Sequence, residues 1–509
     1  EETTAAQTEA AKTEAETTAA AQTEAGGEKN LVMPSASCVA NLNPLLEGYK
    51  EAAMLNPIYD PLYVIDVNET RYYLADSYEV SEDGMQITVK LKEDLKWHDG
   101  EAITADDMIF TMDVCSDTNN GAGGTNIVIL NDQPVKYEKV DDLTVKVTLP
   151  MASASYADLL GGLTLIPEHV FEGNPSVVSA GEANMKGIGS GPYKVTEFKQ
   201  DEYLLLEKYE DYYMGAPSID KVTFRIISDL SAQEVALMNG EVNFMELANA
   251  PAVAKYEADP NFTVVKYPEG RVNYLAVNKF CETVQDPKVV EAVFAALNRD
   301  EIIAGAYGDG MAESANSIFS NVNTFYDPSV EGYTQDVEKA KQLVKETGLD
   351  SKTLTLYFNS ERVYMKESAQ IIQQQLKNVG INLEVIPLES AGFFEKVFGT
   401  DGDYEFYLNG YGAVGDPDQV VAGMYDGTWG VNLAVSDEVS QLWKDARTVY
   451  TPEERAAIYK QIQIQTRDEL TCYPIAYPNY VFVTTSNIKG ADTIKRTPVF
   501  EDYTKLTME

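Results

Sequence analysis

The most informative segment of this chain is Leu95-Lys96-Trp97-His98-Asp99-Gly100-Glu101-Ala102-Ile103-Thr104-Ala105-Asp106-Asp107. It predicts the end of a strand, a tight turn and the start of a helix. The Asp99-Gly100 pair has the composition that turns favour. Thr104 and Asp107 have the spacing of a capping box in which an aspartate replaces the usual glutamate, so each side chain should bond the other residue's backbone N–H. The segment is therefore expected to be structural and to carry no chemistry itself.

The length and charge of the chain limit both its architecture and its partners. A chain of 509 residues exceeds what one hydrophobic core supports, so two or three domains are expected. The formal net charge of −42 argues against nucleic acid as a partner, because polyanion binding needs a basic surface. It also argues against a peripheral hold on anionic lipids. No run approaches 18 consecutive apolar residues, so the sequence predicts no membrane-spanning helix.

The N-terminal residues 1–29 are expected to form a disordered tether. They consist almost only of Glu, Thr, Ala, Gln and Lys, and a near-repeat at Glu2–Ala10 returns at Glu16–Ala25. A segment of this composition cannot bury a core. Such a tether suits a lipoprotein held at the outer face of a membrane, although the lipid-bearing cysteine that this would need is absent from the chain.

The cysteines and histidines give no basis for metal or redox chemistry. The cysteines are Cys38, Cys115, Cys281 and Cys472. They stand far apart without a Cys-x-x-Cys pair, which leaves disulfides and buried free thiols both open. The two histidines, His98 and His169, belong to no catalytic motif, and no Gly-x-Ser-x-Gly or His-Glu-x-x-His occurs. We therefore expect no metal site, no cofactor and no catalytic residues.

Three more segments have distinctive turn and strand chemistry. Gly187–Val195 reads Gly-Ile-Gly-Ser-Gly-Pro-Tyr-Lys-Val, and Tyr212–Phe224 contains Tyr-Met-Gly-Ala-Pro-Ser-Ile-Asp. The glycines of the first segment do not make a phosphate loop, because Pro192 breaks the helix start that phosphate binding needs. Ala236–Asn243 predicts a helix closed by Gly240 and then a strand.

The second half of the chain changes to regular alternation of strands and helices. Asp286 and Pro287 predict a helix start. Leu354–Phe358 and Ile381–Ile386 predict strands on either side of a helix with apolar residues every three or four positions, which Gly380 ends. A unit of this kind predicts two parallel strands with a right-handed connection.

These segments, in this order, resemble the hallmarks of family 5 of the extracellular solute-binding proteins, the oligopeptide- and dipeptide-binding components of bacterial ABC importers. The resemblance covers roughly residues 30–509, with Asn243 at a position where the family usually has aspartate. It implies an α/β fold, a two-lobed periplasmic-binding-protein-like clamp of the large class, with an extra subdomain in the first lobe and two hinge crossings. Closure of such a clamp over a ligand would signal occupancy to a membrane permease.

The resemblance also implies limits for the two lobes. The first lobe is expected at 30–265 and 480–509, with a subdomain inserted at about 53–185, and the second lobe at 266–479. The crossings between them are expected in Phe262–Lys266 and in the region from Tyr473 to Val483.

In the peptide-binding members of the family, main-chain groups bind the peptide as an added strand and charged side chains meet its two ends. The residues expected to contact a ligand therefore lie in loops on both sides of the hinge. They are Glu47, Gly48 and Tyr49 after the first strand, Ala248 and Asn249 in a second loop, Arg271 and Asn273 at the start of the second lobe, Arg362 and Lys366 at a helix start, Asn409, Gly410, Tyr411, Gly412, Ala413 and Asp416 around the Asp-Pro-Asp segment, and Tyr477 and Tyr480 at the second crossing.

One expected ligand anchor is missing from this chain. In the family, an aspartate just upstream of the Asp-Pro-Asp segment holds the α-amino group of the ligand, and that position falls on Ala413. Either Asp416 or Glu47 replaces it, or the ligand has no free α-amino group there. Arg271, Arg362 and Lys366 are candidate anchors for a ligand carboxylate.

The resemblance implies capture of a small ligand, first of all an oligopeptide or dipeptide, and its delivery to the permease subunits of an ABC transporter. It implies a monomeric lipoprotein at the extracellular face of the cell membrane, or a periplasmic protein, without enzymatic activity. The alternative is the same clamp with a non-peptide ligand, such as an oligosaccharide, an opine-like compound or a metal chelate. A hydrolase is the alternative that the sequence supports least.

Overall fold

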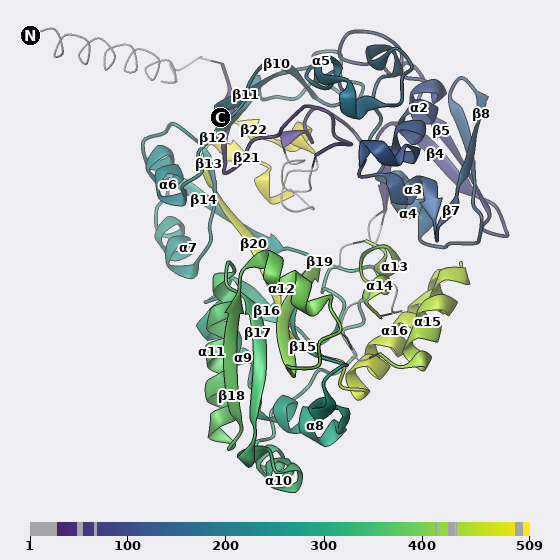
Figure 1. Ribbon diagram of the computed structural model, residues 1–509. Helices are drawn as coiled ribbons and strands as arrows, with labels where there is room; N and C mark the ends of the chain where they lie inside the picture. The colour runs from purple at the N-terminus through teal and green to yellow at the C-terminus, as the bar shows by residue number, and fades with distance from the viewer. Residues whose placement is uncertain are drawn as a thin grey trace, which may run out of the picture.

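The computed structural model describes residues 28–47, 54–65, 69–412, 415–425, 433, 435–493 and 502–509. Nearly all of the tether expected at residues 1–29 lies outside this part of the chain. The described residues form two α/β lobes that are joined on one side by long strands (Figure 1).

The centre of the first lobe is a four-stranded sheet in the order β1-β12-β11-β10. Its strands are β1 (Asn30–Ser35), β10 (Tyr193–Lys199), β11 (Tyr203–Lys208) and β12 (Lys221–Ile226). β1 is parallel to β12, and the other pairs are antiparallel. The short C-terminal strands β21 (Ile488–Lys489) and β22 (Thr507–Met508) lie against the same core, which contains both Leu31 and Leu506. The end of the chain thus returns to the lobe in which the described chain begins.

An inserted subdomain, at the upper right of Figure 1, contains a second antiparallel sheet in the order β4-β5-β9-β8. Its elements are β2 (Tyr63–Ile65), β3 (Thr70–Tyr72), β4 (Ala75–Val80), β5 (Gln86–Leu91), α2 (Ala105–Ser116), α3 (Thr125–Val128), β6 (Ile129–Leu130), β7 (Gln133–Pro134), β8 (Lys136–Asp141), β9 (Thr144–Thr148), α4 (Tyr156–Gly161) and α5 (Gly181–Asn184). The apolar residues that alternate along β5 and β9, such as Val89 and Val145, are buried together with Trp97.

The segment around Trp97 forms the turn and the helix start that its sequence predicts. Gly100 has a φ of +94°, in the left-handed region that glycine tolerates. The Thr104 N–H donates to Asp107 Oδ2 at 2.9 Å, and the Thr104 side chain accepts from the first turn of α2, which completes the capping box. The sequence prediction for this element is confirmed.

His98 joins this segment to the glycine-rich segment at residues 187–195. The Gly189 N–H donates to His98 Nδ1 at 3.1 Å, and His98 Nε2 lies 2.9 Å from the Gly191 carbonyl oxygen. Because Nδ1 accepts, the ring proton belongs on Nε2. Burial lowers the pKa of His98 to about 4, so the imidazole is neutral at pH 7. Gly189 approaches Ile58 so closely that a Cβ would lie 1.9 Å from the Ile58 oxygen.

Asn243, at the position where the family usually has aspartate, binds the backbone of β1. Its Oδ1 accepts from the Val32 N–H at 2.7 Å, and its Nδ2 donates to the Asn30 oxygen at 2.9 Å. An ionised aspartate could accept the first hydrogen bond but could not donate the second. The nearby elements are α6 (Leu230–Met238), β13 (Phe244–Glu246) and α7 (Ala250–Glu257).

The second lobe is a mixed sheet with helices on both faces. Its strands are β15 (Arg271–Val277), β16 (Ala312–Ser314), β17 (Thr353–Asn359), β18 (Asn382–Leu388) and β19 (Phe406–Gly412). β17 is parallel to β18 and to β19, as the sequence predicts for the first of these pairs. Leu275 and Tyr274 point to opposite faces and belong to two different cores. The first core contains α8 (Pro287–Ala296), α9 (Arg299–Ala306), α10 (Val337–Thr347) and α11 (Val363–Asn378), and the second contains α12 (Ser390–Val397), α14 (Ala422–Tyr425), α15 (Asp437–Thr448) and α16 (Pro452–Asp468), with α13 (Pro417–Val420) before α14.

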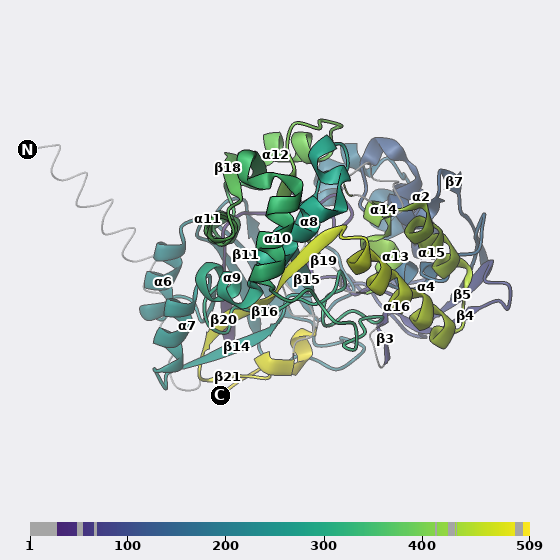
Figure 2. The same ribbon diagram turned by 90° about the horizontal axis from the view of Figure 1, so that it is seen from below.

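Two strands connect the lobes. β14 (Phe262–Pro268) leads into β15, and the long β20 (Cys472–Thr485) runs back beside them (Figure 2). The first half of β20 pairs with β15 in the second lobe, and its second half pairs with β14 and β13. These are the two hinge crossings expected from the sequence. The exact lobe limits at 265/266 and 479/480 stay a prediction.

The cysteines form no disulfide: all four are free, and three of them are buried. Of the two alternatives left open by the sequence, the structure shows free thiols.

Candidate ligand-binding site

The crossing from β14 to β15 is a short, bent connection. Pro268 pairs with Asn479 on β20, and the next residue, Glu269, donates its N–H to the Pro478 oxygen at 2.9 Å. Gly270 then has a φ of +71°, a left-handed conformation that other residues rarely adopt. The chain turns here and enters the second lobe at Arg271. The side chains around this point therefore lie where the two lobes join.

Arg271 is held in place by the second lobe. Its Nε donates to Asn273 Oδ1 at 2.9 Å, and its Nη2 donates to the Gly410 oxygen at 2.7 Å. Asn273 in turn donates from Nδ2 to the Tyr307 hydroxyl at 2.8 Å. Arg271 also faces Gly412 across the β15–β19 ladder. The structure therefore brings together four of the predicted site residues, with the Arg271 guanidinium fixed but not neutralised by these bonds.

A second guanidinium belongs to the same neighbourhood. The Tyr307 ring stacks on Tyr364 with centroids 5.3 Å apart, and Tyr364 lies in the first turn of α11, two residues after Arg362. Arg362 is half-buried at the position that precedes α11, and within the described residues its side chain makes no hydrogen bond or ion pair. Lys366 is exposed one turn further along the helix. Arg362 is thus the more enclosed of the two predicted cations on this helix.

Glu269 adds a carboxylate to the hinge cluster. Burial raises the pKa of Glu269, and the positive charges of Arg271 and Arg362 oppose that shift. The hinge cluster, which we define as Glu269, Arg271, Asn273, Tyr307, Tyr364 and Arg362, therefore has two guanidiniums and one carboxylate. With one more positive than negative charge, it can accept an anionic group from a ligand.

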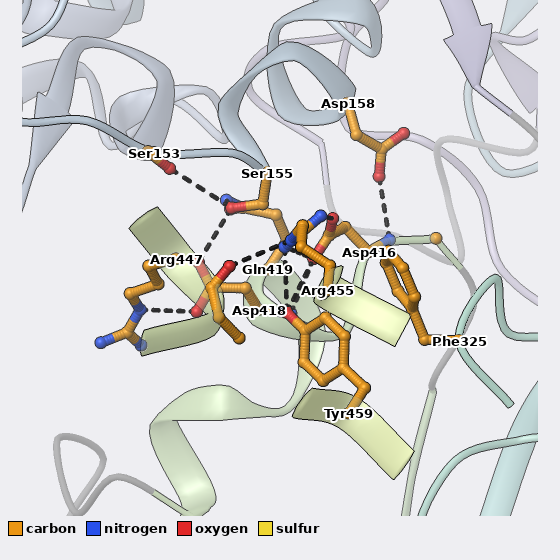
Figure 3. A network of polar contacts seen from close by, with 12 residues as sticks. Ser153, Ser155, Asp158, Phe325, Asp416, Asp418, Gln419, Arg447, Arg455 and Tyr459 are labelled. Atoms are coloured by element: carbon orange, nitrogen blue, oxygen red, sulfur yellow. Dashed lines mark hydrogen bonds and ion pairs between the residues drawn. The ribbon is translucent and has the colours of Figure 1, made fainter. Parts of the chain in front are cut away.

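Asp416 lies in a different environment, directly before α13, where the second lobe faces the inserted subdomain (Figure 1). Figure 3 shows its polar contacts. Its carboxylate accepts from Arg455 Nη1 at 2.5 Å and from Arg455 Nη2 at 3.1 Å, and Asp416 is 8% exposed. The Arg455 guanidinium also lies over the ring of Phe325, 4.9 Å from its centroid. A bidentate pair of this kind satisfies both partners. In this structure the Asp416 carboxylate holds α13 on α16, and its replacement of the missing amino-group anchor stays a prediction.

The Asp-Pro-Asp segment also contacts the inserted subdomain. Ser155, just before α4, donates to Asp418 Oδ2 at 2.8 Å and accepts from Gln419 Nε2 at 2.6 Å. The Asp416 N–H donates to Asp158 Oδ2 at 3.0 Å. Burial raises the pKa of Asp418, and the Arg447 guanidinium opposes this, with its Nε 2.6 Å from Asp418 Oδ1. These bonds join the first lobe to the second lobe (Figure 3).

Two backbone acceptors extend this contact. The Ala154 N–H donates to the Arg447 oxygen at 2.9 Å, and the Tyr450 hydroxyl donates to the Gly84 oxygen at 3.3 Å. We call the whole set the far contact, defined by Gly84, Ala154, Ser155 and Asp158 of the first lobe and by Asp416, Asp418, Gln419, Arg447 and Tyr450 of the second lobe.

Several predicted ligand residues have structural partners instead. Tyr411 and Tyr477 are buried in the core of the second lobe, where the Tyr477 hydroxyl donates to Asn316 Oδ1 at 2.9 Å. Asn249 caps α7 by accepting the Ala252 N–H at 3.0 Å. Glu47 accepts the Asn41 N–H at 2.8 Å. For these residues the structure shows a packing or capping role.

The remaining predicted residues have other surroundings. Ala248 is exposed, Asn409 is half-buried, and Tyr480 is half-buried with its ring 5.5 Å from that of Tyr267. Gly48, Tyr49 and Ala413 lie outside the described residues. Their part in ligand binding stays a prediction.

Sequence reasoning missed three members of the hinge cluster. Glu269 directly precedes the segment that contains Arg271 and could have been found by its position. Tyr307 and Tyr364 could not, because only the fold places these two tyrosines, 57 positions apart in the chain, in a stack beside Arg271.

In the described ranges, no helix combines the length and the apolar character needed to cross a bilayer. Among the same residues, no group of three or more His, Cys, Asp or Glu side chains is placed to hold a metal ion.

The sequence pattern of a known family, the bacterial extracellular solute-binding proteins, family 5 Middle, matches residues 69–432 of this chain. The dipeptide-binding protein of Escherichia coli strain K12 is 27% identical over 499 residues, which cover 91% of this chain and 92% of that protein.

Two solved structures with this fold show how far the similarity extends. The ABC transporter substrate-binding protein CtaP of Listeria monocytogenes has a TM-score of 0.88 and 32% identity, and the alignment covers 94% of this chain and 99% of that chain. The oligopeptide-binding protein AppA of Bacillus subtilis, in complex with a nonapeptide, has a TM-score of 0.73 and 26% identity over 95% of this chain and 99% of that chain. Both lobes and the hinge are included at this coverage.

Proposed function

Because this chain belongs to family 5 of the bacterial extracellular solute-binding proteins, we propose that it captures a peptide between its two lobes and delivers it to the permease of an ABC importer. The role is binding and transfer, without catalysis. The relatives named for dipeptides and oligopeptides support this ligand class.

One observation carries the proposal: the hinge cluster has two guanidiniums, those of Arg271 and Arg362, beside the single carboxylate of Glu269, and among the described residues the half-buried Arg362 side chain makes no hydrogen bond or ion pair. A half-buried cluster with an excess of positive charge gains stability when an anion arrives. The α-carboxylate of a peptide is such an anion. Arg271, which the Gly410 oxygen and Asn273 hold in a fixed orientation, lies in the same cluster and can share the charge.

The finer features of the role follow from the same family membership. We propose that the protein acts as a monomer outside the cytoplasmic membrane, and that a lipid anchor joined through residues 1–29 keeps it near the permease. The composition of those residues supports a tether. A test of this arrangement is whether the protein, expressed from its native gene, partitions into detergent after globomycin-sensitive processing.

The ligand class is tested by native mass spectrometry of the purified protein, followed by release and sequencing of the bound molecules. Peptide binding predicts a set of masses that fragment into amino acids and show the ligand length. A single non-peptide mass would retain the clamp and contradict the peptide ligand.

The role of Arg362 is tested with alanine peptides of two to nine residues in calorimetric titrations. Arg362→Ala should weaken binding by about 2 kcal/mol, in the range measured for charged hydrogen bonds. Lys377→Ala is the matched control, because Lys377 is an exposed cation near the C-terminal end of the same helix. If both variants bind as the unchanged protein does, Arg362 is not an anchor for the ligand.

A further inference from the structure

The far contact is built from two halves that each lobe prepares on its own. In the second lobe, Arg455 fixes the carboxylate of Asp416, and Arg447 fixes that of Asp418. Asp416 also accepts the Asp418 N–H at 3.0 Å, which sets the start of α13. The remaining hydrogen-bonding groups of this segment, the Asp416 N–H and Asp418 Oδ2, face the first lobe (Figure 3). Hydrogen bonds and ion pairs within the second lobe hold these groups in this orientation.

The first lobe supplies the complementary groups from the start of one short helix. Ser155 is fully buried in this structure, and Asp158 follows in the first turn of α4. The Ser155 side chain makes no capping bond to its own helix; its hydroxyl instead serves Asp418 and Gln419 of the other lobe. The Ser155 hydroxyl therefore has its main hydrogen-bond partners in the second lobe.

The chemistry of the far contact allows the lobes to separate. The groups that meet are hydroxyls, carboxylates, an amide and backbone groups, which water can satisfy when they part. Within the second lobe, the carboxylates of Asp416 and Asp418 are paired with the guanidiniums of Arg455 and Arg447. The two lobes therefore meet through a few hydrogen bonds and bury no unpaired charge of this segment. A contact of this kind is weaker than a permanent interface.

The far contact is connected to the hinge cluster through β19. That strand carries Gly410, whose oxygen binds Arg271, and it ends at Gly412, four positions before Asp416. We propose that the far contact is a latch, which stabilises the closed arrangement of the lobes independently of the ligand between them and sets how fast that ligand leaves. The part of this inference that concerns the ligand rests on the proposed function.

The latch has a quantitative signature. If opening precedes release, a weaker latch lowers the population of the closed state and raises the dissociation constant of every ligand by one common factor. A residue that touches the ligand would instead change different ligands by different factors. The two roles can therefore be separated with two peptides.

The first experiment measures dissociation rates and affinities of two alanine peptides of different length, chosen as binders from the titrations above. Ser155→Ala combined with Asp158→Ala should raise both dissociation rates roughly tenfold and equally, because three hydrogen bonds between the lobes are lost. Ser155→Ala alone should give a smaller common factor. Unchanged rates, or factors that differ between the peptides, would overturn the latch.

Ser153→Ala is the matched control. The Ser153 hydroxyl lies two residues from Ser155 and, within the part of the chain that the structure describes, bonds only the Ser155 hydroxyl of its own lobe, at 3.3 Å. It should leave both rates unchanged. Circular dichroism and thermal unfolding show whether each variant is folded, and Ser155→Ala keeps the test open if the double variant is not, because Asp418 retains Arg447.

The second experiment needs no ligand. Small-angle X-ray scattering compares the radius of gyration of the ligand-free protein with that of the variant that combines Ser155→Ala and Asp158→Ala. The latch predicts a larger radius of gyration for the variant, because its lobes separate more often. Equal radii of two folded proteins would overturn the latch. If no peptide binds the protein, the proposed function fails while this comparison still decides the latch.

Discussion

The two lobes meet in two places that are built in different ways. At the hinge, β14 and β20 pair over seven successive residues, and the ladder continues through the Glu269 N–H to the Pro478 oxygen. At the far contact, most hydrogen bonds between the described residues of the two lobes involve a side chain, and the bond from the Ala154 N–H to the Arg447 oxygen joins two backbone groups. The hinge therefore depends on the backbone, and the far contact depends on a few identifiable side chains.

This difference predicts where the protein can be altered without loss of its fold. A side-chain substitution leaves backbone ladder bonds in place, so the hinge should tolerate most changes that keep its conformation. Substitutions at the far contact should change the closed arrangement itself. Arg455 is the exception, because it lies at the far contact and also holds the second lobe together.

The largest effect is expected from Arg455→Met, which removes the partner of a buried carboxylate. Asp416 would then be a buried charge without its ion pair, and the free energy of unfolding should fall by about 3–5 kcal/mol. Denaturant unfolding followed by circular dichroism measures the loss. Arg447→Ala is the comparison, because the Arg447 side chain is 23% exposed against 6% for Arg455, and it should cost less than half as much.

The same pair allows a rescue. Asp416→Asn combined with Arg455→Met removes both charges and keeps an oxygen that can cap α13, so part of the lost stability should return. A double variant as unstable as Arg455→Met alone would show that Arg455 acts through packing on Phe325 and not through Asp416.

A smaller effect on stability is expected when the pH is lowered, because His98 links two segments of the first lobe. His98 links its segment to Gly189 and Gly191 as a neutral ring, and burial lowers its pKa from 6.5 to about 4. The unfolded chain binds this proton below about pH 6.5, and the folded protein binds it only near pH 4. Stability from this group is thus complete above pH 6.5 and is lost as the pH falls toward 4, by about 3 kcal/mol in total.

The measurement compares the unfolding free energy of His98→Gln with that of the unchanged protein from pH 7 to pH 4. The difference between the two should shrink as the pH falls, because only the unchanged protein loses the histidine contribution. His169→Gln removes the other imidazole of the chain and identifies any slope that belongs to it. A difference that is constant across this range would contradict the neutral, buried state of His98.

The sequence predicted the elements whose causes lie within a few residues. The capping box of Thr104 and Asp107, the βαβ unit and the two crossing strands all arise from short-range spacing or from motif order. The far contact could not be predicted in this way. Asp158 and Asp416 are 258 positions apart, and neither has a neighbour that points to the other.

The predicted ligand residues also differ in whether nearby sequence could reveal their surroundings. Arg271, Asn273 and Gly410 come together on the β15–β19 ladder, and the sequence analysis grouped them only through the family resemblance, because it predicted neither strand. Tyr477 was expected to line a cleft and is buried, because a tyrosine at a strand position suits a core as well as a surface. Asp416 was expected to be available for a ligand, and its partner Arg455 lies 39 positions away with no local signal.

A still smaller loss of stability is expected from Gly270→Ala at the hinge. The left-handed φ of +71° costs a residue with a Cβ about 1–2 kcal/mol, so the unfolding free energy should fall by that amount. Gly392→Ala is the control, because Gly392 lies in α12 with open space around it and a helical glycine gains stability on replacement by alanine. Equal changes of the unfolding free energy in the two variants would mean that Gly270 does not have a left-handed conformation in the folded protein.

The smallest effect is expected from Tyr450→Phe, which removes the hydroxyl that donates to the Gly84 oxygen and accepts from the Ser153 N–H. At 3.3 Å the bond to Gly84 is long, and the loss of the hydroxyl should cost about 0.5–1 kcal/mol. If the far contact is a latch, the loss raises peptide dissociation rates a few-fold and leaves the hinge ladder unchanged. The aromatic ring remains in the variant, so its packing over Gly84, where a Cβ would lie 1.9 Å from the Tyr450 ring, is preserved. The rate increase should be smaller than that of the double variant at Ser155 and Asp158. An equal increase would mean that the Tyr450 hydroxyl alone provides most of the strength of the far contact, which would contradict a contact shared among several hydrogen bonds.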